Sequence, residues 1–567
     1  MKYLKISLVF ILFFIFNLSN SLSQNNLLNI LSEEINREME VLKKQENPPY
    51  YMNYRVNDVH SFTITSSFGT LVESKEDKER ILTISIRIGT PELDNTREIR
   101  GESSFISFNF SEQTKLPLEN SPEAIKQILW KKTNEEYRTA VDKYIKVKAN
   151  VASKVAQEDK SPDFTIEKTV KYIEPPYTDD EIKINQSLWE QKVKSFSKPF
   201  LDEPEIYQGY STFSWKVERK YFVATDGSQI AQNMTYCRLF VAGTIKADDG
   251  MVMPLYLSYF AFRPEQLPSE EKILADVKQM VANLKALKNA PVAEPYTGPA
   301  ILTGRASGVF FHEIFGHRVE GHRQKSEYEG QTFKKKVGER ILPSSMNIIF
   351  DPTIRNYKGN DLIGYYKYDD EGVEGQRVTI VDKGVLKNFL MSRCPIENFP
   401  KSNGHGRAEA GYEPVARQSN LILETTQPKS YEELRKLLIQ ECKAQGLPYG
   451  YHIIDITGGF TITGRTIPNS FNVMPTLVYR IYTDGRPDEI VRGVDLVGTP
   501  LAMFSQIAEA GNDFEIFTGI CGAESGGVPV TAISPSLFVK KIETQKKSKS
   551  QEKPPLLPRP GTKPDKD

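Results

Sequence analysis

A change of pattern near residue 300 most constrains how this chain of 567 residues can fold. Before it, strand-like alternation of apolar and polar residues is mixed with helix-like periodicity. After it, glycine is frequent and short strands alternate with turns. These patterns predict an α+β protein with an N-terminal α+β domain at 24–290, a linker at 291–299 and a largely antiparallel C-terminal domain at 300–543.

The first domain contains distinct candidates for helices and strands. Apolar spacing predicts helices at Leu27–Lys44 and Pro268–Leu287, and a charged, helix-rich stretch lies at about 119–205. Alternation predicts strands at His60–Leu71 and Arg80–Ile88, with a charged turn between them. We therefore expect helices and strands to be mixed throughout this half of the chain.

Both ends of the chain have the composition of segments outside the folded domains. Lys2 and Lys5 flank the start of an apolar run, Ile6–Phe16, and small residues follow it, so the sequence predicts a signal peptide at 1–23. The run is shorter than the ~20 residues of a membrane-spanning helix. The lysine- and proline-rich residues 544–567 predict a disordered tail. We expect an exported protein, periplasmic or extracellular, without an integral membrane segment after cleavage.

The charge balance and the cysteine count exclude two classes of protein. Lys and Arg number 73, as do Asp and Glu, so the net charge is zero and a nucleic-acid partner is not expected. Four cysteines in so long a chain do not make a disulfide framework. Three of the six histidines, His312, His317 and His322, fall within one short stretch, and this clustering indicates a functional site.

That stretch contains a spaced pair of metal-ligand candidates, His312-Glu313-x-x-x-His317. Ser307 is the expected N-cap of the helix that carries them. On a regular helix, residues five apart lie about 140° from each other, so one metal can bind both rings only if the helix is distorted. A single π-type turn would widen the spacing, and Gly316 would lower its steric cost.

The residues themselves leave the third ligand open. Cys442 lies on an apolar helix stripe and Cys237 in a strand-like run, so both are expected in the core, while Cys394 lies in a turn. Cys521 lies in a glycine-rich segment, where a thiolate could reach a metal. Glu320 is the alternative ligand, because it follows the second histidine by three residues.

Longer stretches around the motif resemble a known family. They read GRASGVFFHEIFGHRVEGHRQKSEYEGQTFKKKVGERIL from residue 304, DDEGVEGQRVTIVDKGVLKNFL, SNGHGRAEAG, RGVDLVGTPLAMFSQI and CGAESGGVPVTAISPSLFVKKIE. Over about residues 300–543 the chain resembles the TldD/PmbA family, formerly called modulators of DNA gyrase and now regarded as zinc metallopeptidases. The likeness is looser in the first domain, where PELDNTREIRG is similar. The stretch at 119–205 departs from the shorter members and is interpreted as a helical insertion.

The resemblance implies a site and an activity. The family's zinc ligands fall on His312, His317 and Cys521, with Glu313 as the general base. Members that keep this motif are the catalytic, TldD-like subunits, and paralogues without it, the PmbA/TldE-like proteins, are non-catalytic partners in a dimer. The site then lies in an enclosed cavity that admits peptides or unfolded polypeptide segments. Three protein ligands leave a fourth position for water, as in catalytic zinc sites.

Three further residues are candidates for positioning the substrate or stabilising the oxyanion: His322, His405 and Arg407. Ordinary turn hydrogen bonding is the alternative role for each. The alternative function is a zinc-stabilised, non-catalytic binding or assembly subunit paired with a paralogue. A role in modulating gyrase is not expected, because the predicted signal peptide and zero net charge both argue against it.

Overall fold

The computed structural model describes residues 26–99, 113–153, 159–465 and 470–547. The predicted signal peptide at 1–23 and the last part of the predicted tail lie outside these residues. Within the ranges described, no helix is both long and apolar enough to cross a membrane. The fold is α+β and mostly antiparallel, as the sequence predicts.

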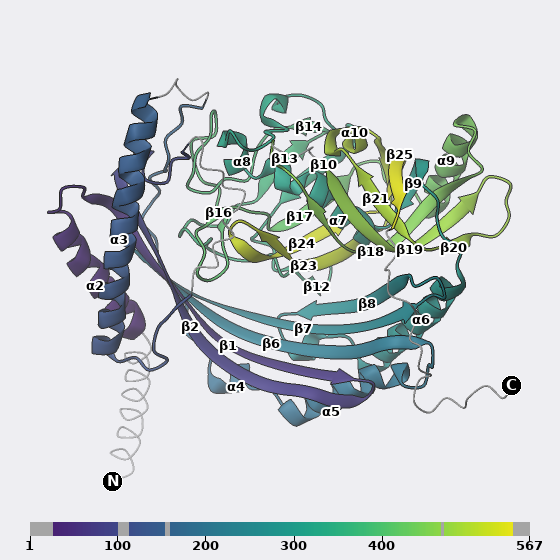
Figure 1. The fold of residues 1–567 in the computed structure, drawn as a ribbon, viewed down its shortest axis with the longest axis horizontal. Helices are drawn as coiled ribbons and strands as arrows, with labels where there is room; N and C mark the ends of the chain where they lie inside the picture. The colour runs from purple at the N-terminus through teal and green to yellow at the C-terminus, as the bar shows by residue number, and fades with distance from the viewer. Residues whose placement is uncertain (1–25, 100–112, 154–158, 466–469, 548–567) are drawn as a thin grey trace, which may run out of the picture.

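The N-terminal domain is built on long antiparallel strands that curve around the rest of the molecule (Figure 1). They run in the order β2-β1-β6-β7-β8 within an eight-stranded sheet. Their bounds are β1 Pro49–Ser67, β2 Thr70–Thr90, β6 Ile206–Ala224, β7 Gln229–Lys246 and β8 Val252–Ala261.

The predicted charged turn between the first two strands is wrong. β1 and β2 are both longer than predicted, and the chain reverses at Phe68 and Gly69, which have φ angles of 47° and 79°. The charged residues lie in the first half of β2, an exposed edge of the sheet. Edge strands commonly carry charged side chains, and this composition hid the strand pattern.

Helices cover one face of this sheet and leave the other face free to line a cavity. The main helices are α2 Asn26–Leu42, α3 Pro122–Ser153, α5 Gln186–Ser197 and α6 Glu270–Asn289. Their apolar sides form two core clusters with the sheet, one around α5 and α6 and the other around α2 and α3. The helices predicted within 119–205 are therefore present and pack on the sheet, with α3 at one end of it (Figure 1).

The C-terminal domain places helix α7, Gly304–Ile314, between two sheets (Figure 1). One sheet has the order β14-β13-β10-β17-β24-β23, and the other has the order β18-β9-β25-β21-β19-β20 with β22 beside β25. Nearly every side chain of α7 is buried, and Gly308 allows its backbone to approach Ala532 of β24 closely. The helix is therefore held rigidly on both sides.

The strands of this domain have the following bounds: β9 Tyr296–Leu302, β10 Met346–Phe350, β13 Val378–Asp382, β14 Val385–Leu386, β17 Asn420–Thr425, β18 Tyr449–Thr461, β19 Phe471–Tyr482, β20 Glu489–Val491, β21 Val494–Gly498, β22 Ile507–Ala510, β23 Glu515–Ala523, β24 Gly526–Ser534 and β25 Leu537–Lys546. Helix α9, Tyr431–Ala444, packs against β9, β18 and β25. Its N-cap is Ser430, and Cys442 is buried on its inner side.

The predicted linker and tail both overlap the second sheet. β9 starts at Tyr296, inside the predicted linker at 291–299, and lies between β18 and β25. Pro299 falls within β9 where the pairing with β25 is irregular, between Val539 and Ile542. Proline has no N–H to donate, so a strand accepts it at such an irregularity, and its presence made the segment look like a linker. β25 likewise continues through Lys546.

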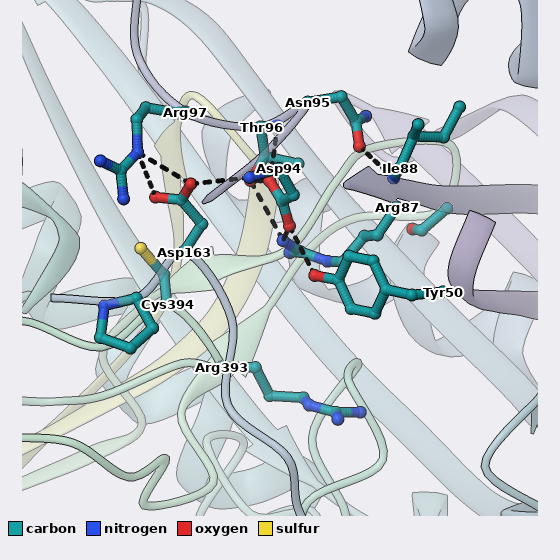
Figure 2. A network of polar contacts seen from close by, with 12 residues as sticks. Tyr50, Arg87, Ile88, Asp94, Asn95, Thr96, Arg97, Asp163, Arg393 and Cys394 are labelled. Carbon is teal, nitrogen blue, oxygen red and sulfur yellow. Dashed lines mark hydrogen bonds and ion pairs between the residues drawn. The ribbon is translucent and has the colours of Figure 1, made fainter. Parts of the chain in front are cut away.

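A polar network within the N-terminal domain lies beside Arg393 and Cys394 of the C-terminal domain (Figure 2). Arg87 of β2 donates to Asp94 at 2.8 Å, and Arg97 donates to Asp163 at 2.8 Å. The backbone N–H of Asp94 also donates to Asp163 at 3.0 Å, which ties the two pairs together. Lys325 of the C-terminal domain lies 3.3 Å from the same Asp163 carboxylate. These contacts hold the N-terminal domain against the segment that follows the histidine motif.

Candidate metal centre

Three potential metal donors converge where α7 meets β23. His312 Nε2 lies 3.2 Å from Cys521 Sγ, and His317 Nε2 lies 3.3 Å from the same sulfur. All three donor atoms lie within 4.8 Å of one another. Around a tetrahedral zinc a sulfur and an imidazole nitrogen lie about 3.6 Å apart, from bond lengths of roughly 2.3 and 2.1 Å. The donor types and their spacing therefore fit a zinc ion.

The two histidines meet because the helix ends between them. α7 stops at Ile314, Phe315 adopts φ −124° and ψ −51°, and a 3₁₀ turn follows at Gly316–Val319. The predicted π-type turn is thus wrong: the α-helix breaks instead of widening. The break brings the rings of His312 and His317 to a centroid separation of 4.9 Å.

The ends of α7 also differ from the prediction. The helix starts at Gly304 after Thr303, and Ser307 lies inside it, where its hydroxyl donates to Pro535 O at 2.7 Å. A Cβ at position 316 would overlap the side-chain amide of Gln418, which would then have to move. The Gln418 side chain donates to the His312 carbonyl at 3.3 Å, which helps to hold the break in place.

Cys521 is buried in β23 and carries strong polar partners. Arg417 donates to its sulfur at 3.2 Å and to its carbonyl oxygen at 2.6 Å. Burial alone would raise the pKa of the Cys521 thiol, but the two imidazoles and the Arg417 guanidinium lower it well below its usual value. Burial instead raises the pKa of Cys442 to about 12. The thiolate, which is the form that binds metals, is therefore favoured at Cys521.

Glu320 lies behind His317 and does not converge with the three donors. Its carboxylate is 3.3 Å from His317 Nδ1, accepts from Arg323 at 2.8 Å and lies 3.5 Å from Arg417. Burial alone would raise the pKa of Glu320, but the His317 ring and the Arg323 guanidinium lower it to about 2. A carboxylate on Nδ1 orients a ligating ring so that Nε2 faces the metal.

A cavity of about 940 Å³ opens in front of the donors, between the free face of the N-terminal sheet and the C-terminal domain. Glu313, which is 6% exposed, lines it together with His312 and His317. The Glu313 side chain packs against Gly459 of β18, where a Cβ would come within 2.8 Å of Glu313 Cγ. The absence of a side chain at Gly459 leaves room for this carboxylate beside the donors.

His322 lines the same cavity. Its Nε2 lies 2.5 Å from Glu524 of the β23–β24 turn, and that carboxylate also accepts from Arg323 at 2.8 Å. The ring is therefore oriented by a carboxylate at the cavity wall. A contact between His322 and a substrate stays a prediction.

His405 and Arg407 lie elsewhere. His405 is 0% exposed, its Nδ1 lies 3.1 Å from Asn403 O, and its Nε2 lies 3.0 Å from Ser419 Oγ. Arg407 lines a neighbouring cavity of about 520 Å³ and stacks 4.8 Å from the Tyr366 ring. The structure contradicts the prediction that His405 contacts substrate, because every polar atom of its ring faces protein. Arg407 is not at the metal centre.

The stability of the protein should show that His405 is structural. Burial lowers the pKa of His405 to about 3 from an unfolded value near 6.5, so its contribution is fully present above pH ~6.5 and is lost as the pH falls toward 3. We expect the free energy of unfolding to fall by about 1.4 kcal/mol per pH unit in that window from this group. His405→Asn should be less stable at pH 7 by about 1–3 kcal/mol and show a shallower slope.

Urea unfolding between pH 4 and pH 7.5 measures both quantities. A parental slope in the variant, together with a raised KM for a peptide substrate, would instead support a substrate contact at His405.

Sequence reasoning missed the residues that support the donors from a distance. Arg417 and Gln418 lie together just before β17, Gly459 lies in β18 and Glu524 lies in the β23–β24 turn. No local pattern gives any of them a role at the metal site. Only Glu320 was noted, and its role is orientation of His317 and not convergence with the donors.

Two imidazoles and a thiol converge at the wall of a cavity that Glu313 also lines, and this donor set leaves a fourth position open at a zinc ion. Residues 295–546 match a family model described as the PmbA/TldA metallopeptidase C-terminal domain. The chain carries a C-terminal domain of the PmbA/TldD family, as the sequence resemblance indicates.

Similar proteins are named metalloproteases. The chain is 26% identical over 352 residues to a metalloprotease of Methanocaldococcus jannaschii, which is 61% of this chain and 68% of the relative. It is 30% identical over 261 residues to a metalloprotease of Archaeoglobus fulgidus, covering 46% and 56%. It is 24% identical over 278 residues to a zinc metalloprotease TldD homologue of Saccharolobus solfataricus, covering 47% and 57%. The last two alignments span about half the length of each relative.

Solved structures share the fold over nearly the whole chain. TldE from Thermococcus kodakarensis superposes with a TM-score of 0.59 at 14% identity, covering 90% of this chain and 99% of TldE. A protein of Thermotoga maritima described as a modulator of a DNA gyrase has a TM-score of 0.57 at 16% identity, covering 90% and 99%. These similarities establish the common fold.

Proposed function

We propose that the protein is a zinc-dependent peptidase that hydrolyses peptides or unfolded polypeptide segments, with Glu313 as general base. The observation that carries this proposal is the convergence of His312, His317 and Cys521 beside Glu313 in a cavity between the domains. The metalloprotease names of the relatives support the same class.

Each of these residues would have a separate role in the reaction. A zinc ion held by the three donors would act as a Lewis acid toward water and the substrate carbonyl. Glu313 would take the proton of the attacking water and deliver it to the leaving amine. His322, oriented by Glu524, would contact the substrate at the cavity wall.

The size of the cavity supports a peptide as substrate. A volume of about 940 Å³ lies at the upper end of the range for small-ligand pockets, roughly 300–1,000 Å³, and holds a short stretch of extended chain. A folded domain does not fit into such a space. The cavity is shaped by both domains, and we propose that it is enclosed further by a partner, either a second copy or a non-catalytic TldE-like paralogue.

Export is part of the proposal and rests on the N-terminal sequence. An exported peptidase with a restricted cavity would act on peptides or unfolded chains outside the cytoplasm. The four cysteines have no disulfide partner among the residues described. Zinc coordination would shield the Cys521 thiolate from oxidation in that environment.

The test is to purify the protein, measure bound metal and incubate it with a peptide library. We expect one zinc per chain, hydrolysis that a chelator abolishes, and recovery when zinc is added back. Zinc binding without hydrolysis, alone and with a co-exported paralogue, would support the non-catalytic binding subunit instead.

A further inference from the structure

An arginine lies on the wall of the cavity contributed by the N-terminal sheet. Arg238 of β7 lies on the free face of the sheet, because side chains alternate along a strand and Cys237 faces the core. Its neighbours on this wall are Phe240 of β7 with Tyr256 and Ser258 of β8. Phe240 and Tyr256 stack with ring centroids 5.3 Å apart.

Arg238 has no carboxylate partner among the residues that the structure describes. Its Nη1 makes only long contacts with uncharged oxygens, 3.4 Å to Ser258 Oγ and 3.5 Å to Thr518 O. Its Nη2 is buried without a hydrogen-bond partner. Burial lowers the pKa of Arg238, which shows that the surroundings disfavour its charge.

Arg323, the other arginine that lines the cavity, does have carboxylate partners. Arg323 is paired with three carboxylates, those of Glu320, Glu329 and Glu524, at 2.8 Å each. The Arg238 side chain is partly buried, with Nη2 fully buried. A desolvated guanidinium without a counter-charge is unfavourable for stability, so its presence on a cavity wall indicates a ligand that supplies the charge. The carboxylates that line the cavity elsewhere would repel an anion, and this leaves the neighbourhood of Arg238 as the favourable place for one.

The position of Arg238 relative to the metal centre sets the length of the ligand. Thr518, whose carbonyl oxygen contacts Arg238, lies three residues before Cys521 on β23. Since a strand advances about 3.3 Å per residue, the guanidinium lies roughly 10 Å along β23 from Cys521. An extended peptide in the cavity covers that span with about three residues.

We propose that Arg238 determines specificity by binding a carboxylate of the peptide substrate about three residues from the cleaved bond. The carboxylate is either an acidic side chain or the free C-terminus, and the planar fork of arginine binds both in the same bidentate way. The stacked rings of Phe240 and Tyr256 pack against the apolar part of that residue. This inference rests on the proposed peptidase function.

The test compares the binding of matched peptides to the Glu313→Gln protein, which removes the complication of cleavage. One pair differs by a free or amidated C-terminus, and the other by a single Glu or Gln along the chain. We expect the peptide with the carboxylate to bind about tenfold to a hundredfold more tightly, as charged hydrogen bonds do. Only one pair should show this ratio, and that pair identifies the source of the carboxylate.

Variants of Arg238, made in the Glu313→Gln protein, test whether Arg238 causes the difference in binding between the two peptides of a pair. Arg238→Gln should reduce the ratio to about one, and Arg238→Lys should keep part of it. Lys216→Gln is the matched control, because Lys216 lies on the same sheet face but lines the neighbouring cavity. It removes the same charge and should keep the parental ratio. Circular dichroism checks that each variant is folded.

The outcomes separate this inference from the peptidase proposal. Equal binding within both pairs, or a ratio that Arg238→Gln leaves unchanged, overturns the role of Arg238. If the ratio depends on Arg238 while the parental zinc protein cleaves nothing, the carboxylate site stands and the peptidase proposal fails. If the zinc protein cleaves peptides but neither pair shows a preference for the carboxylate, the peptidase proposal stands and the role of Arg238 fails.

Discussion

Replacing Glu313 by Gln should abolish peptide hydrolysis while leaving zinc bound. Glu313 lies beside the three donors without being one of them, so metal affinity should stay at the parental value. Loss of the general base should lower kcat by about 10²–10⁴-fold. Gln has nearly the same shape as Glu, so the packing against Gly459 should be preserved. Metal analysis and single-turnover cleavage of a peptide measure the two quantities.

Glu98→Gln is the matched control for this variant. Glu98 also lines the cavity, but it accepts hydrogen bonds from Ser326 and from the backbone of Glu327. Its amide variant should therefore cleave at close to the parental rate. Parental hydrolysis by the Glu313→Gln protein would mean that another group accepts the proton, and the proposed mechanism would be wrong.

Replacing Cys521 by Ala should lower zinc affinity and activity together. Only His312 and His317 would remain as donors, and Arg417 would lose the sulfur that it contacts. We expect zinc affinity to fall by more than about 100-fold, since even the loss of an outer partner of a ligand costs roughly 10–100-fold. Competition with a zinc-binding dye measures this. Cys394→Ala, which removes a thiol in a different cavity, should leave zinc affinity unchanged.

Thiol labelling checks the same assignment without a mutation. Zinc should protect Cys521 from an alkylating reagent, and chelation should expose a thiolate that labels readily. Cys442 should stay unreactive in both states, because it is buried and its pKa is raised to about 12.

Equal labelling of Cys521 with and without zinc would contradict the assignment. Glu320 would then be the next ligand to consider. Glu320→Gln separates the two roles: as the partner that orients His317, it should weaken zinc binding by about 10–100-fold, which is less than Cys521→Ala.

Much of the fold could be predicted from local patterns, and the errors have physical causes. The helix predicted at Pro268–Leu287 is present as α6, Glu270–Asn289, since its cap and apolar side are local features. The first half of β2 was missed because an exposed edge lacks alternation. β9 was interpreted as a linker because Pro299 lies at an irregular point of its pairing, and pairing with β25 is not visible in the sequence.

The candidate site was also predicted from the sequence only in part. His312, Glu313 and His317 were found from their types and spacing, but the distortion that joins the two rings was predicted as a π-type turn. The structure instead ends α7 at Ile314 and continues as a 3₁₀ turn. The Gln418 side chain, which donates to the His312 carbonyl and fills the space beside Gly316, lies about 100 positions away in the chain, beyond the reach of any local pattern.

The sequence by itself determined the two histidine donors, the position of the candidate base and the α+β pattern, because each depends on residues close together in the chain. Only the tertiary structure decided that Cys521 meets the histidines, that Glu320 lies against His317, and that Arg238 lines the same cavity without a carboxylate partner among the residues described. These relations join β7, α7 and β23, which the pairing of strands and the packing of α7 between two sheets bring together. Long-range packing, and not local spacing, sets the distances at which this chemistry is possible.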